Sequence, residues 1–138
     1  MSTPDLTQYT GDLATNTTYQ LEMKVVGWVE AGTGSFSSLS DDSLAFSGSF
    51  DKGGHSGTVQ LSLTVSGDNS GTVTAVVTDN NETKINLQDQ ACTFSEDDGT
   101  LTISPSDSDN TLEAKSYEGG MELWGSGFSH TVWIGADS

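Results

Sequence analysis

The sequence contains no arginine and only four lysine residues, against 20 acidic residues, so its formal net charge is −16 and its isoelectric point is near 4.1. Nucleic-acid binding depends on neutralising phosphates with lysine and arginine, and this composition nearly excludes it. Attraction to anionic lipid headgroups is disfavoured for the same reason. The charge instead suits a soluble acidic protein, a basic or cationic partner, or a high-salt environment.

Cysteine is also nearly absent, because Cys92 is the only one, and this excludes an intramolecular disulfide. Ala91 precedes it, Phe94 follows it, and no lysine or histidine adjoins it to lower the pKa of the thiol. We therefore expect a buried, unreactive side chain. One cysteine and two distant histidines support a zinc site poorly.

Long apolar runs are missing as well. No stretch of about 18 apolar residues occurs, so no membrane-spanning helix is expected. The residues after Met1 are polar, so no signal peptide is visible in this chain, and the compartment is left unknown. No amphipathic pattern of about ten residues is evident, which disfavours α/β architectures. The two prolines, Pro4 and Pro105, are both expected in connections.

What the chain does contain is apolar alternation. Apolar residues occupy every second position over residues 59–65 and again over 73–77, on either side of a Gly-Asp-Asn-Ser-Gly turn at 67–71. Period-two alternation around such a turn predicts a β-hairpin. The fold class is therefore expected to be all-β and antiparallel.

The rest of the chain repeats this pattern. Residues 31–40 fit either a loop or a strand of small residues, and further strands are expected at 18–29, 43–50, 83–87, 91–94, 100–104, 111–117, 120–124 and 128–134. A glycine where the alternation slips, Gly27, indicates a bulge or a sharp bend. Turns every ~8–12 residues predict an eight- to ten-stranded closed barrel, with a barrel-like β-sandwich as the alternative. We expect one β domain over residues 18–138, preceded by an N-terminal arm at 1–17 whose polar composition favours flexibility.

One stretch carries a family resemblance. Residues 119–128 read GGMELWGSGF and are followed by Thr131-Val132-Trp133. This stretch resembles the Gly-rich strand motif of the actinobacterial virulence-associated proteins, the Vap family. The resemblance covers residues 119–133 alone and implies a compact eight-stranded antiparallel barrel without known enzymatic activity. It implies no functional residue.

No catalytic constellation stands out. His55 lies in a glycine-rich loop, and His130 shares a face with Phe128 and Val132, so we expect an exposed bystander and a structural histidine. No Gly-x-Ser-x-Gly nucleophile elbow is placed between a strand and a helix. The sequence therefore favours a protein that is not an enzyme, without excluding one.

Acidic and amide side chains recur in the loops 79–82 and 107–110. Ca²⁺ prefers about 6–8 oxygen ligands from carboxylates, amides and carbonyls. The candidate metal ligands are Asp79, Asn81, Glu82, Asp107 and Asp109. Neither loop matches an EF-hand, and Asp and Asn are also ordinary turn formers. No other cofactor is predicted.

The candidate ligand-binding residues are the three tryptophans, Trp28, Trp124 and Trp133. Trp133 is out of phase with Val132 and Ile134, so we expect it on the outer face. Exposed rings beside Asp, Asn and Gly loops can stack on sugars or pack on a partner protein. Core or bulge-covering aromatics are the alternative.

The leading hypothesis is a non-enzymatic acidic β-barrel binding or effector-type module with a protein or carbohydrate partner. The first alternative is a calcium- or carbohydrate-binding β domain. The second is a small β-barrel enzyme or ligand carrier, which an interior filled by Leu, Val and Phe would argue against, because a carrier needs an open cavity. The oligomeric state is left open.

Overall fold

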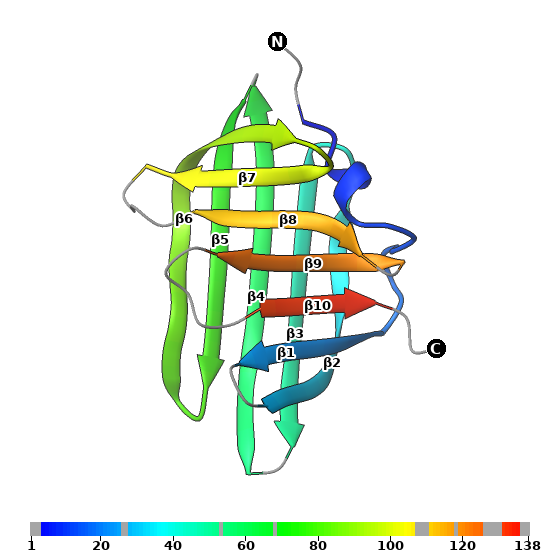
Figure 1. Cartoon of the computed structure of the whole chain (residues 1–138), viewed down its shortest axis with the longest axis vertical. Helices are drawn as coiled ribbons and strands as arrows, with labels where there is room; N and C mark the ends of the chain where they lie inside the picture. Colours follow the sequence, from blue (N-terminus) through cyan, green and yellow to red (C-terminus); the bar gives the residue numbers. More distant parts are fainter. Residues whose placement is uncertain are drawn as a thin grey trace.

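A computed structural model describes residues 4–25, 28–52, 54–67, 69–106, 111–117, 119–125 and 131–135. These residues form ten antiparallel strands that run up and down in chain order and close into a barrel, because the first strand pairs with the last (Figure 1). The strands are β1 (Tyr19–Val25), β2 (Trp28–Leu39), β3 (Ser43–Lys52), β4 (His55–Gly67), β5 (Ser70–Asp79), β6 (Glu82–Asp97), β7 (Thr100–Pro105), β8 (Leu112–Tyr117), β9 (Gly120–Gly125) and β10 (Thr131–Gly135). The expected closed antiparallel barrel is confirmed, and the sandwich alternative is not adopted.

The hairpin of β4 and β5 follows directly from its alternation. Leu61 pairs with Ala75 and Leu63 pairs with Val73, so the apolar residues of both strands share one buried side. The intervening Ser and Thr side chains face outward. A one-residue slip would exchange the two faces, so burial of the apolar side fixes the register.

The barrel interior is one continuous apolar cluster to which every strand of the barrel contributes. At its centre the rings of Phe36 and Phe46 meet edge to face with centroids 5.0 Å apart. Tyr19 packs against Phe36 in the same manner, with centroids 6.3 Å apart. Burial of this apolar surface is the dominant stabilising contribution expected for such a barrel.

Phenylalanine rings in this core lie directly on glycine backbone. A Cβ placed on Gly57 would lie 2.5 Å from Cζ of Phe50, and one placed on Gly71 would lie 2.8 Å from Cε2 of Phe94. A ring lying over a strand glycine covers its Cα methylene, and the missing side chain lets the strand curve tightly. These glycines are therefore part of how the barrel closes.

Three expectations about strand limits are wrong. The strand expected over residues 18–29 is two, because β1 ends at Val25 and β2 begins with Trp28 paired to it. Two short strands were expected across residues 83–94, but β6 runs through both, since a bulge at Asp89 (φ 53°) takes up the irregularity. Pro105 ends strand β7 and pairs with Cys92; the end of a strand tolerates its missing N–H. Residues 31–40, left open between loop and strand, lie largely in β2.

The N-terminal segment covers one end of the barrel. It contains a single 3-10 turn, η1 (Leu6–Tyr9), capped by Asp5, whose carboxylate accepts a hydrogen bond from the backbone N–H of Thr7. Leu6 and Tyr9 are buried as part of the core, and the Tyr9 hydroxyl donates to the Glu96 carboxylate. Figure 1 shows η1 beside β8 at this end, and an isolated parallel bridge between Thr15 and Phe36 follows it.

Candidate functional site

Among the residues described, the aromatic side chains that reach the outer surface gather on β8, β9 and β10. Their register places Lys115 opposite Glu122, and Glu122 opposite Trp133. The residues between them in sequence, such as Ala114 and Leu123, point into the core. We call the outward-facing group the aromatic wall; its members are Lys115, Tyr117, Glu122, Trp124 and Trp133.

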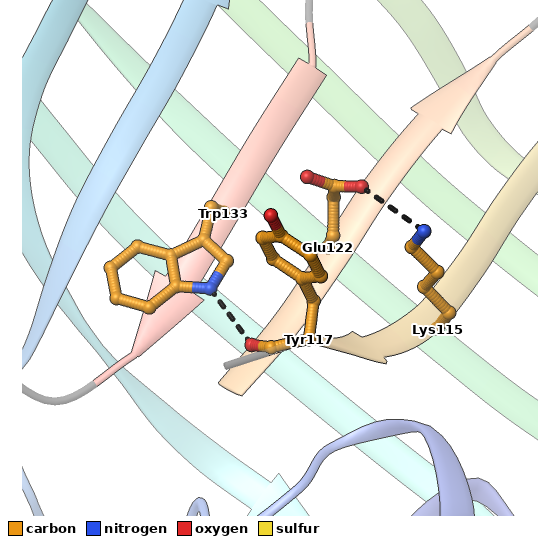
Figure 2. A network of polar contacts seen from close by, with 4 residues as sticks. All are labelled: Lys115, Tyr117, Glu122 and Trp133. Carbon is orange, nitrogen blue, oxygen red and sulfur yellow. Dashed lines mark hydrogen bonds and ion pairs between the residues drawn. The ribbon is translucent and has the colours of Figure 1, made fainter. Parts of the chain in front are cut away.

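Trp133 is the base of the aromatic wall. It faces outward, yet it is only 7 % exposed. Its ring lies over Gly135, where an added Cβ would be 2.5 Å from the ring atom Cη2, so only glycine leaves room for it. The indole Nε1 donates a hydrogen bond of 3.1 Å to the backbone oxygen of Tyr117, as Figure 2 shows. The ring is therefore fixed by packing and by one directed bond.

Lys115 lies between two aromatic rings. Its Nζ is 5.3 Å from the centroid of the Tyr117 ring and 5.3 Å from the centroid of the Trp124 ring. Both distances are within the range of a cation–π interaction. Oε1 of Glu122 lies 3.9 Å from the same Nζ (Figure 2), so two rings and a carboxylate surround the ammonium group.

The aromatic wall, apart from Trp133, is accessible to solvent. Tyr117 is 39 % exposed and is the only exposed large hydrophobic residue among those the structure describes. Trp124 is half-buried, and the side chains of Lys115 and Glu122 are 38 % and 16 % exposed. By contrast, the outer faces of β3 to β5 carry mainly serine and threonine. The aromatic wall therefore differs in chemistry from that opposite side of the barrel.

Two of the three candidate ligand-binding tryptophans thus come together. Trp124 and Trp133 lie on the same outer face of neighbouring strands. Trp133 faces outward as the sequence predicts, but its side chain is buried rather than exposed to solvent. The side chain of Trp28 lies outside the described residues; its backbone opens β2. Binding by these residues stays a prediction.

The candidate calcium ligands belong to two separate loops, and the structure describes only the first of them. Asp79, Asn81 and Glu82 belong to the β5–β6 turn, whose two central residues, Asn80 and Asn81, have φ of 53° and 70°. Positive φ at both positions is typical of a type I′ hairpin turn, for which Asn is favoured. Asn80 also accepts a hydrogen bond of 2.9 Å from the backbone N–H of Ser56. This turn therefore has a structural reason for its asparagines.

The other two candidates, Asp107 and Asp109, lie outside the described residues. Across the described part of the chain, no three side chains of His, Cys, Asp or Glu are grouped as a metal ion would require. Calcium binding stays a prediction.

The remaining reactive residue types offer no second site among the residues described. The side chain of His55 and the whole of His130 lie outside that part of the chain. Cys92 is a free, buried thiol, as the sequence predicts, and burial raises its pKa to about 11. A thiol with so high a pKa is protonated and unreactive at neutral pH.

Sequence reasoning missed three members of the aromatic wall: Lys115, Tyr117 and Glu122. The signal was present, because Lys115 and Tyr117 are two residues apart, as are Glu122 and Trp124, and each pair therefore shares a face. Tyr117 pairs with Gly120, which sets the register of the β8–β9 hairpin. Pairing the two alternations across this turn would have brought the four residues together.

Comparison with known protein families finds no match to this chain, and no curated protein and no solved structure matches it either. The resemblance of residues 119–133 to the Vap family stays a prediction. Within the described residues, no helix has the length and apolar character needed to cross a membrane.

Proposed function

We propose that this protein is a non-enzymatic binding module, of the effector type in the sense that it acts by binding, and that the aromatic wall is its recognition surface. The observation that supports the proposal most directly is the partial exposure of Tyr117 and Trp124 on either side of a Lys115–Glu122 pair. Aromatic rings with adjacent charged groups are typical of the residues that dominate binding energy. They stand on paired strands, which hold them more precisely than loops do.

The interior favours binding over catalysis or transport. The inward-facing side chains form one apolar cluster dominated by Leu, Val, Ile and Phe. Thr10 and Asp79 are the buried polar side chains of the described chain. An enzyme site needs several convergent polar groups, and a carrier needs an open cavity. Both remain alternatives with less support.

Carbohydrate binding is the second candidate, because the partly exposed rings of Tyr117 and Trp124 lie beside polar side chains. An aromatic ring can stack on the apolar face of a sugar while neighbouring carboxylates accept hydrogen bonds from its hydroxyls. This candidate uses the same residues as the first and differs in the ligand.

The test is a titration of the ¹⁵N-labelled protein with an octalysine peptide, with chitotriose and cellotriose, and with CaCl₂. We expect one ligand to shift the backbone amide signals of residues 113–124 and 131–135. Tyr117→Ala should weaken that binding about tenfold, while Gln60→Ala, on the exposed outer face of β4, should leave it unchanged. Shifts confined to other strands, or equal affinity of Tyr117→Ala and the unaltered protein, would overturn the proposal.

A further inference from the structure

We propose that the aromatic wall recognises cations, and that Lys115 is an intramolecular stand-in whose place a lysine or arginine side chain of a basic partner takes. This inference rests on the proposed binding function and names its partner class. It commits to a basic polypeptide rather than to a sugar.

The geometry around Lys115 is that of a cation site. Two ring centroids lie 5.3 Å from its Nζ, and a carboxylate oxygen of Glu122 lies at 3.9 Å. Aromatic faces combined with a carboxylate are the groups by which proteins bind alkylammonium and guanidinium ligands. The chain has therefore assembled such a site and filled it with its own ammonium group.

The backbone that carries the two rings is anchored on the side away from Lys115. Tyr117 is held at its backbone, where the oxygen accepts the hydrogen bond from Trp133. Figure 2 shows Trp133 and Lys115 on opposite sides of Tyr117. The backbone of Trp124 is held by the β8–β9 ladder, in which it pairs with Glu113. The backbone that carries each ring would therefore stay in place if Lys115 left, and the ligand would not have to order it.

Lys115, in contrast, is held weakly. Its side chain is 38 % exposed, and its ion pair with Glu122 is at the long end of the range. Exposed ion pairs and exposed cation–π contacts each stabilise little. A lysine stem is flexible and its ammonium group is well hydrated in water, so its displacement by an incoming cation is cheap.

Charge identifies the occupant. The chain carries a net charge of −16, which attracts basic polypeptides and speeds their association. Glu22 pairs with Trp133, and Glu113 pairs with Trp124, so acidic residues flank the aromatic wall; Lys24 follows on β1. A neutral sugar that displaced Lys115 would leave the Glu122 carboxylate without its cation, whereas a lysine or arginine side chain would replace the lost charge.

The experiment compares two variants that each remove one positive charge from the same outer surface. Lys115→Ala vacates the site, while Lys24→Ala, on β1, leaves it filled and serves as the matched control. The probes are the octalysine peptide and tetramethylammonium chloride, titrated at fixed ionic strength. Binding is followed by tryptophan fluorescence and by the amide signals of Tyr117 and Trp124.

We expect Lys115→Ala to bind both probes about fivefold more tightly than the Lys24→Ala control. Glu122→Gln, which keeps the shape of the side chain, should weaken binding of the peptide about threefold or more. Thermal unfolding of each variant shows whether it is folded, and Glu122→Gln tests the site even if Lys115→Ala is unstable.

Equal affinity of Lys115→Ala and Lys24→Ala for both probes would overturn the inference, and so would an unchanged affinity in Glu122→Gln. If chitotriose or cellotriose shifts the aromatic wall and the cations do not, the binding function stands and the cation inference fails. If no ligand in either experiment affects the aromatic wall, both fail together.

Discussion

The indole Nε1 of Trp133 lies 3.1 Å from the backbone oxygen of Tyr117, and this hydrogen bond joins β10 to the end of β8 across the intervening strand β9. The two strands are not neighbours in the sheet, so the bond adds a connection that the backbone ladder does not supply. It explains why an outward-facing tryptophan is 7 % exposed, and it orients the strand end that carries the most exposed aromatic ring described.

Trp133→Phe should destabilise the protein by about 1 kcal/mol, because it removes the hydrogen bond and keeps most of the ring. Trp133→Ala should cost about 3–5 kcal/mol, because it also removes the buried ring. Urea denaturation followed by circular dichroism measures both. Trp124→Phe, at a half-buried position of the same aromatic wall, is the control and should cost less than Trp133→Phe. Equal costs for the two Phe variants would show that the bond to Tyr117 contributes nothing.

Gly57→Ala should destabilise the barrel by about 1–3 kcal/mol or more, because the new Cβ would collide with the backbone oxygen of Thr78 and with the Phe50 ring. Gly67→Ala is the matched control, since its Cβ would meet only Oγ of Ser70, at 3.2 Å. The control should change the free energy of unfolding by less than about 1 kcal/mol. Thermal and urea unfolding of both variants test the pair, and similar melting temperatures for the two would contradict the close approach.

The free energy of unfolding should fall as the pH rises above 10, and Tyr9 should account for part of the fall. Burial, and then the hydrogen bond and charge of Glu96, raise the pKa of Tyr9 above its ordinary value of 10.0. The folded phenol keeps its proton at a pH where the unfolded one loses it, so stability is fully present below pH 10 and is lost above it. Tyr9→Phe should show a shallower fall in urea titrations between pH 8 and 11. A fall in Tyr9→Phe as steep as that of the wild-type protein would contradict the contribution of Tyr9.

Cys92 should react with a thiol reagent only when the barrel unfolds. It is buried, and burial raises its pKa to about 11. Labelling by a chromogenic disulfide at pH 8 should therefore be at least about 1,000-fold slower in the native protein than in 8 M urea. A cysteine introduced by Ser66→Cys on the exposed face of β4 should react rapidly in the same assay. Fast labelling of native Cys92 would show that the barrel opens near β6 without global unfolding.

Sequence alone predicts those parts of the fold that local alternation determines. Residues 59–65 and 73–77 alternate without interruption, and they form the hairpin of β4 and β5. Whether a strand continues past an irregular position cannot be predicted from the residues around that position alone. At Asp89 the ladder to β5 resumes beyond the bulge, because β5, the preceding strand, supplies partners on both sides of it. The apolar alternation of residues 83–94 is therefore interrupted at Asp89, although strand β6 continues through it.

The candidate site could likewise be predicted only in part from the sequence. The outward direction of Trp133 follows from its phase relative to Val132 and Ile134. Its burial depends on Gly135 beneath the ring and on the carbonyl of Tyr117 two strands away, which only the assembled barrel brings together. The position of Lys115 between two rings likewise depends on the β8–β9 register. The side of the sheet that a residue faces can be predicted from the sequence. The burial of Trp133 and the rings around Lys115 depend on neighbouring strands.

The pairing of β1 with β10 also sets when the barrel can close during synthesis of the chain. Until residues 131–135 leave the ribosome, β1 and β9 both present unpaired backbone groups along an open seam. A nascent chain stalled before that point would expose two unpaired edge strands, β1 and β9. It would depend on chaperones to keep these edges from pairing with other chains. Emergence of β10 is thus the step that converts an open sheet with two exposed edges into a closed barrel.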